Sequence, residues 1–258
     1  MTFFDYALLC VSALAAGSIN GAIGSGSLVT LPVLLAVGIE PTAAIATNTI
    51  AMVLSALGGT LANREQLLRE RREIAPLTLI AVVGGAIGAV LLLVTSPDAI
   101  QFVVLILLAV ALLMVVGQPF IARWLTRRAG ETPQFPYRSA ATRIGAFFTS
   151  IYGGYFAAAQ GVLLLGILGI TTRRPIRDIN GVKNLMTFTV NVTAALAFTV
   201  TALFGGIDVK WLAVAVMAGA ALFGGYQGAA IAKRLPDLLL RALVVVVAIA
   251  SLTHAALS

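Results

Sequence analysis

The stretch that decides the fold is Gly17 to Gly38, GSINGAIGSGSLVTLPVLLAVG, an apolar segment interrupted at residues 24–27 (Gly-Ser-Gly-Ser) and again at Pro32. A segment this apolar belongs in a protein interior or in lipid, yet glycine and proline are poor residues for a helix interior. In hydrocarbon a broken helix leaves backbone N–H and C=O groups unpaired, so the break persists only where it lines a cavity or is buried in protein. The stretch therefore predicts a broken helix at the centre of a membrane protein.

The composition of the whole chain places it in the membrane. Of 258 residues, 60% are hydrophobic and 10% are charged, and the mean hydropathy is +1.02, whereas soluble domains carry about 25% charged residues. A membrane-spanning helix needs about 20 apolar residues, and the chain offers runs of this length or longer. The apolar runs are 4–38, 42–62, 74–94, 99–120, 140–170, 184–206, 211–232 and 238–257. We therefore expect an all-α integral membrane protein with eight to ten helical segments.

The basic residues choose between two topologies for the two longest runs, both of which are broken. If each broken run crossed the membrane once, loops 62–73 and 121–140 would lie on one side and loop 171–183 on the other. If each run enters and leaves on the same side as a hairpin, all of the 17 Lys and Arg residues except Lys210 fall on one side. Positively charged loops mark the cytoplasmic side. The charges favour two hairpins, with these three loops cytoplasmic and both termini outside.

This topology gives the two halves of the chain opposite orientations. Each half is a broken helical hairpin followed by three transmembrane helices, so we expect two inverted-topology repeats. We assign residues 1–121 to the first membrane repeat, 122–139 to a cytoplasmic linker and 140–258 to the second membrane repeat. Short matches in the same order support the duplication, among them Thr47-Asn48 with Lys183-Asn184.

Several functional classes are excluded by the residue types present. The chain has one histidine, His254, and one cysteine, Cys10, so it offers neither a histidine-based nucleophile triad nor a multi-ligand metal site. No pair of acids lies inside an apolar run. The net charge of +7 is explained by membrane orientation rather than by nucleic-acid binding. We expect no enzymatic activity, no metal and no other cofactor.

The polar residues near the two breaks form the candidate binding site. Half-helix N-termini near the midplane are a common design of substrate sites in secondary transporters, and their N–H groups and positive dipole ends favour anions. Lys183 would add a positive charge, and no buried carboxylate competes for a cation. We expect a small anionic substrate, and the candidate residues are Asn20, Gly24, Ser25, Gly26, Ser27, Thr47, Asn48, Tyr152, Gly153, Gly154, Gln160, Lys183 and Asn184. Tyr155 and Gly161 belong to the same break as Gln160.

Each of these assignments has a structural alternative. Lys183 is equally well explained as an interface lysine at the cytoplasmic surface. Thr47, Asn48 and Asn191 lie within apolar runs, where polar residues serve either function or interhelical hydrogen bonds. Glycines outside the breaks, such as Gly88, are typical of close packing between helices.

The motifs around the breaks resemble those of the TauE/SafE family of sulfite and organosulfonate exporters. The resemblance rests on the glycine-rich break and Pro32 in segment 17–48, on the Ala46-Thr47-Asn48 end of that segment, and on residues 152–155 (Tyr-Gly-Gly-Tyr) and Lys183-Asn184. It departs from the family where Phe156 is followed by three alanines instead of a glycine. The resemblance covers nearly the whole chain and implies a bacterial inner-membrane permease for sulfur-containing anions.

The leading hypothesis is a secondary transporter that exports a small sulfur-containing anion, such as sulfite or an organosulfonate, across the bacterial inner membrane. Two alternatives stay open: a passive anion channel, and a membrane partner or assembly subunit without transport activity. The lipid bilayer is the expected surrounding, and the oligomeric state is left open.

Overall fold

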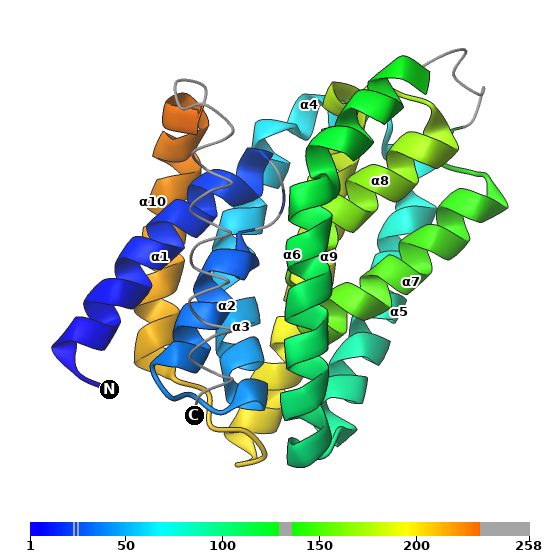
Figure 1. Ribbon diagram of the computed structural model, residues 1–258. Coiled ribbons are helices and arrows are strands. Elements are labelled where there is room, and N and C mark those ends of the chain that lie inside the picture. Colours follow the sequence, from blue (N-terminus) through cyan, green and yellow to red (C-terminus); the bar gives the residue numbers. More distant parts are fainter. Residues whose placement is uncertain (23, 25, 129–135, 233–258) are drawn as a thin grey trace.

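The computed structural model describes residues 1–22, 24, 26–128 and 136–232, and every regular element in this part of the chain is a helix (Figure 1). The all-α prediction is therefore confirmed. The helices are α1 (Phe3–Ala22), α2 (Ser27–Ala36), α3 (Pro41–Ala62), α4 (Arg64–Arg69), α5 (Arg71–Val94), α6 (Pro97–Arg128), α7 (Ala140–Phe156), α8 (Gln160–Thr172), α9 (Ile176–Leu203) and α10 (Trp211–Ala232). The last expected apolar run, 238–257, lies outside the described residues.

Five of these helices contain a segment long and apolar enough to cross a membrane, namely α1, α3, α5, α6 and α9. Helices α2 and α8 have 10 and 13 residues and rise only about 15 and 20 Å, against about 30 Å of hydrocarbon. Each broken run therefore forms one longer arm and one arm too short to span. The Thr142 hydroxyl at the start of α7 donates to the Thr171 hydroxyl at the end of α8 at 2.9 Å, so this second arm returns as a hairpin.

The ends of the helices follow from local sequence. Glu40 precedes α3, and its carboxylate accepts hydrogen bonds from the backbone N–H groups of Thr42 and Ala43, with Pro41 at the first helical position. Ser139 caps α7 in the same way, because its hydroxyl accepts from the backbone N–H of Thr142 at 3.0 Å. These caps fix where the long helices begin on either face of the bundle.

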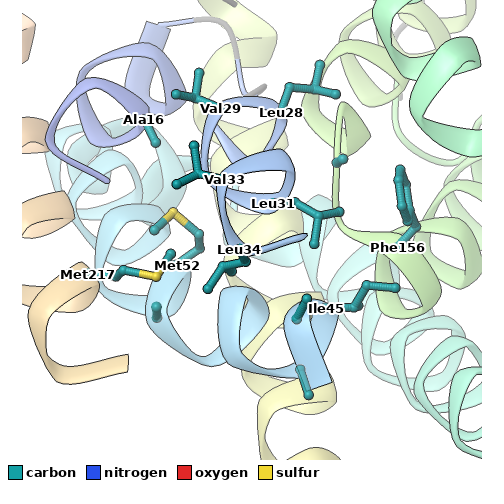
Figure 2. Packing of buried hydrophobic residues seen from close by; sticks show 14 of the residues in the cluster. Ala16, Leu28, Val29, Leu31, Val33, Leu34, Ile45, Met52, Phe156 and Met217 are labelled. Atoms are coloured by element: carbon teal, nitrogen blue, oxygen red, sulfur yellow. The ribbon is translucent and has the colours of Figure 1, made fainter. Parts of the chain in front are cut away.

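Helix α2 is enclosed by the rest of the protein, since every residue from Ser27 to Leu34 is buried. Figure 2 shows Val33 on the side of Met52, whereas Leu31 lies toward Phe156 of α7. A helix that is apolar on all sides is a buried helix. Residues 27–34, which follow the first break, therefore lie in the core of the molecule.

The long helices pack in pairs that repeat between the two halves. Helix α1 packs along α10 and α5 packs along α7, while α3 and α9 pack along each other. A Cβ atom built on Gly88 of α5 would lie 2.1 Å from the Ile151 carbonyl oxygen of α7, and one on Gly224 of α10 would lie 2.1 Å from the Leu14 carbonyl oxygen of α1. Close packing is therefore the role of these glycines.

The packing pairs are the same in the two halves of the chain. If α7 takes the place of α1, α9 the place of α3 and α10 the place of α5, and the reverse, the same helix pairs result. Two repeats with equivalent helices would give this pattern. Their inverted relation stays a prediction.

The basic loops of the two halves meet on one face of the bundle. The Arg174 guanidinium, between α8 and α9, donates to both carboxylate oxygens of Glu70 at 2.9 and 2.7 Å and to the Tyr137 hydroxyl at 2.9 Å. The hydrogen bonds to Glu70 raise the pKa of Arg174 above its usual range, and burial raises the pKa of Tyr137. Loops 62–73 and 171–183 therefore meet at one end of the bundle, as the hairpin topology expects and the single-crossing topology does not. The hairpin topology itself stays a prediction.

All three expected loops are partly helical, and segment 62–73 contains the whole of α4 and the first residues of α5. Segment 171–183 was expected to be a loop, but α9 begins at Ile176, after Pro175, so most of the segment belongs to the helix. Segment 121–140 was also expected to be a loop, yet α6 continues to Arg128. The polar composition of both segments resembled that of loops, but proline is well suited to the start of a helix and charged residues are tolerated where a helix leaves the membrane.

Candidate functional site

The first break separates α1 from α2 and is built around Gly24. Its φ of +78° is in the left-handed region that favours glycine, and its N–H donates to the Asn20 carbonyl oxygen at 3.0 Å. Gly26 lies against α1, because a Cβ atom there would be 2.4 Å from the Ala16 carbonyl oxygen. Ser27 is buried at the first position of α2. Ser25, a member of the predicted site, lies outside the described residues.

The second break separates α7 from α8 and contains two strained alanines. Ala157 and Ala159 have φ values of 60° and 58°, which cost an L-residue about 1–2 kcal/mol each. The Tyr152 hydroxyl donates to the Ala158 carbonyl oxygen at 2.8 Å and holds the turn against α7. Both alanines therefore adopt the conformation for which glycine is preferred.

The two breaks cross and touch through their backbones. The N–H of Gly161, in the first turn of α8, donates to the Gly24 carbonyl oxygen at 3.2 Å. A Cβ atom on Gly24 would lie 2.8 Å from the Gly161 Cα, and one on Gly161 would lie 2.6 Å from the Gly24 Cα. Real Cβ atoms do not approach other atoms this closely, so both positions require glycine. We call this contact the crossing; it brings the N-terminal ends of α2 and α8 together, as expected from the sequence.

Lys183 reaches the crossing from the second turn of α9. Its side chain is fully buried, and its Nζ has no hydrogen-bond partner in the described part of the protein. A Cβ atom on Gly24 would lie 3.2 Å from this Nζ. The alternative that Lys183 is an interface lysine is therefore wrong. A buried ammonium without a counter-ion is costly, and helix N-termini add positive potential, so the arrangement favours a bound anion.

Gln160 supplies a second unpaired polar group next to the crossing. It is fully buried as the first residue of α8, and both its Oε1 and Nε2 atoms are without a partner among the described residues. Its side chain lies over Gly153, where a Cβ atom would be 2.1 Å from the Gln160 Cδ. Gly153 therefore makes room for an amide that is free to bind another group.

The polar residues of α3 are engaged in different ways. The Asn48 Oδ1 accepts a 2.5 Å hydrogen bond from the Thr30 hydroxyl of α2, whereas its Nδ2 is buried and has no partner within the described ranges. The Thr47 hydroxyl accepts from the backbone N–H of Lys210, at the end of the molecule where α3 begins. Thr47 therefore fastens the loop between α9 and α10, while Asn48 has one polar group left to bind a ligand.

Two more predicted residues use their side chains to join helices. The Asn184 Nδ2 donates to the Gly59 carbonyl oxygen at 3.1 Å, and the Asn20 Nδ2 donates to the Ser55 hydroxyl at 3.1 Å. Gly59 is near the end of α3, about 16 Å along the helix from Asn48 at 1.5 Å per residue. The structure therefore does not bring Asn184 and Asn48 together.

Gly154 differs in role from its neighbours. A Cβ atom there would lie 2.3 Å from the Gly85 carbonyl oxygen of α5. The structure accounts for Gly154 by close packing of α7 on α5.

Sequence reasoning missed several residues at the centre. Thr30, the partner of Asn48, was hidden in the apolar sequence of α2, and nothing in its spacing distinguished it. Thr187 also carries a buried hydroxyl that has no partner in the described part of the chain. Asn180 has an unpaired Oδ1 near the start of α9. A polar residue inside an apolar run was the available signal, and it had been applied only to Thr47, Asn48 and Asn191.

The fold and the centre define a class of protein. A multi-pass helical membrane protein whose short half-helices meet at buried, unpaired polar groups has the architecture of secondary transporters. The family model described as "Sulfite exporter TauE/SafE" matches residues 9–254, and the chain belongs to this family.

Two relatives agree with that membership. The chain is 27% identical over 250 residues to a "Probable membrane transporter protein" of Haemophilus influenzae, covering 93% of this chain and 89% of the relative. It is 28% identical over 113 residues to the "Probable membrane transporter protein ORF9" of Sinorhizobium sp, covering 43% of each chain. No solved structure matches the chain significantly.

Proposed function

We propose that the protein is a secondary transporter that exports a small sulfur-containing oxyanion, such as sulfite or an organosulfonate, across the bacterial inner membrane. The observation that carries the proposal is the fully buried Lys183 amine, which has no partner among the described residues and lies beside Gly24 where α2 and α8 begin. The family membership supports sulfite or a related anion as the substrate.

The geometry supports three contributions to anion binding. Lys183 supplies the charge, Gln160 supplies an amide, and the N-terminal ends of α2 and α8 add positive potential. A tetrahedral or pyramidal oxyanion can accept from several donors at once. Since no described acid is buried beside them, a cation would find no balancing charge at this position.

The direct test is anion flux into proteoliposomes that contain the purified protein. Labelled sulfite should exchange against internal sulfite in counterflow, and the K183M variant should lose this exchange by roughly tenfold or more, because a charge-assisted contact is removed. K210M is the matched control, because Lys210 is a lysine on the surface that pairs with Asp208. Its flux should equal that of the wild type.

The outcomes separate the proposal from its alternatives. Flux of sulfite without counterflow exchange, at rates far above those of carriers, would assign the protein to the channels. Absence of flux for sulfite and for a series of organosulfonates would overturn the proposal. Equal flux in K183M and K210M would leave transport standing but remove Lys183 from the site.

A further inference from the structure

Thr187 differs from three other threonines of α9. The hydroxyls of Thr189, Thr193 and Thr201 each donate at 2.9 Å to the carbonyl oxygen four residues earlier, the usual way in which a threonine satisfies its hydroxyl inside a helix. The Thr187 hydroxyl has no partner among the described residues, although its side chain is buried. Thr187 therefore presents a free polar group to the protein interior.

Thr187 is the middle member of a line of unpaired polar groups. Lys183, Thr187 and Asn191 are spaced four residues apart, so they lie on one face of α9. Their relative exposures are 0%, 7% and 3%, and the Lys183 Nζ, Thr187 Oγ1 and Asn191 Oδ1 atoms have no hydrogen-bond partner among the residues that the structure describes. Unpaired polar atoms in a membrane protein are costly unless water or a substrate reaches them. Three in a row indicate a continuous polar track.

The packing of α9 on α3 shows where this track leads. The Asn184 side chain contacts Gly59 near the end of α3, and the two helices run in opposite directions. Asn191 follows Asn184 on α9 by the same number of residues by which Met52 precedes Gly59 on α3, so Asn191 and Met52 lie at about the same depth. Asn48 is about one helical turn from Met52 and is therefore close to Asn191 in depth. The Asn48 Nδ2 and the Thr49 hydroxyl are buried there, and neither has a partner in the part of the chain that the structure describes.

We propose that this face of α9 and the Asn48–Thr49 segment of α3 form the passage along which the anion moves between the Lys183 site and the face of the molecule at which α3 begins. The proposal rests on the proposed function and adds a second binding position between Thr187 and Asn48. Hydroxyl and amide groups there replace part of the hydration of the anion. Because this position has no lysine, it binds more weakly than the Lys183 site and lets the anion leave.

The proposal separates two groups of residues that the sequence placed in one site. Lys183 lies beside Gly24 at the crossing, whereas Asn48 bonds to Thr30, which is six residues after Gly24 and so about 9 Å farther along the chain at 1.5 Å per residue. That distance is larger than a sulfite ion. The two ends therefore cannot hold one small anion together, and the polar groups between them supply the intermediate contacts.

The test uses variants that keep side-chain shape but remove the polar group. T187V and N191L should lower sulfite counterflow by roughly tenfold while leaving sulfite binding, measured by the shift in thermal stability, close to that of the wild type. T189V and T193V are matched controls on the same helix, because their hydroxyls bond only to their own helix. Their counterflow should stay near the wild-type rate.

A second measurement asks whether small anions physically enter the track. In a C10A background, T187C and N191C should react with a negatively charged methanethiosulfonate that carries a sulfonate group, and excess sulfite should slow the reaction. T189C and T193C should react far more slowly. This readout does not depend on the rate of transport.

The outcomes distinguish this inference from the proposed function. If the wild type transports sulfite but T187V and N191L transport equally well, or if their cysteine counterparts stay unmodified in active protein, the passage is elsewhere. If the wild type shows no flux of any sulfur oxyanion, the proposed function fails and the passage fails with it. Loss of flux together with loss of sulfite binding in T187V would place Thr187 in the Lys183 site instead.

Discussion

Gly24 contacts Gly161 at the crossing and also lies beside the Lys183 amine. It needs a positive φ for the turn, no Cβ for the contact with Gly161, and proximity to the Lys183 amine. Gly38 offers a comparison within the same chain, because its φ is +82° but a Cβ atom there would meet nothing within 4 Å. Both glycines have a positive φ, but an added Cβ atom would meet neighbouring atoms only at Gly24.

We expect G24A to abolish sulfite counterflow, because the added methyl would push apart Gly24 and Gly161 and displace the Lys183 amine. G38A should retain counterflow and cost only the backbone strain, about 1 kcal/mol. Flux in proteoliposomes and thermal unfolding in detergent measure the two effects. A G24A protein as active as G38A would show that the crossing is not part of the transport site.

The limits of the sequence at this scale are seen in Lys183 and Asn184. Both were singled out from the sequence, but nothing in the sequence revealed that one side chain is buried beside Gly24 while its neighbour bonds to Gly59. Adjacent helical residues point about 100° apart, and which of them faces the centre depends on the rotation of α9 in the bundle. That rotation is decided by packing, which no single sequence displays.

At the scale of elements, the junction of Glu70, Arg174 and Tyr137 joins three segments that are distant in the chain. Glu70 lies between α4 and α5, Arg174 between α8 and α9, and Tyr137 before α7. The ring of Tyr137 also lies under the Arg174 guanidinium, 5.5 Å from its centroid. Bidentate pairing of this kind is strong because the planar guanidinium matches a carboxylate.

We expect E70Q to lower the free energy of unfolding by about 1–3 kcal/mol, because it leaves a half-buried guanidinium with an unbalanced charge. The R177Q variant is the comparison, since the Arg177 side chain is 86% exposed in its pair with Asp178 and such pairs contribute little. Thermal unfolding of both variants in one detergent gives the comparison. Equal unfolding temperatures for the two would contradict a stabilising role of the junction.

Much of the element pattern was predictable from hydropathy. The break in 4–38 was signalled by Gly24 and Gly26, and the spans α3 and α5 begin and end close to their expected positions. The Glu70–Arg174–Tyr137 junction was not predictable, because its members share no spacing and no motif. Such contacts between distant loops are defined only when the helices are packed.

For the molecule as a whole, the charge distribution predicts the orientation. The loops around Glu70 and Arg174 touch, so they share one side, and the charge bias assigns this side to the cytoplasm. The segment around Ser96 lies at the other end of α5, where Tyr155 donates to Thr95. The orientation can therefore be determined by labelling one exposed position at each end of α5.

In a C10A background, S96C should react with a membrane-impermeant maleimide added to intact cells, whereas L68C in α4 should react only after the membrane is opened. Both side chains are exposed, and Leu68 has 65% of its surface accessible, so neither cysteine needs the protein to open. Labelling of L68C and not of S96C in intact cells would reverse the orientation. Labelling of both in intact cells would contradict the hairpin topology.

The crossing of the two breaks has a consequence for how this architecture diversifies. The contact between Gly24 and Gly161 is made by main-chain atoms, so exchange of neighbouring side chains leaves it unchanged. Residues around it, such as Gln160 and Thr30, can change in polarity without removing this backbone contact. Substitution of the residues that line the site can therefore change the substrate of such a protein while Gly24 and Gly161 stay the same.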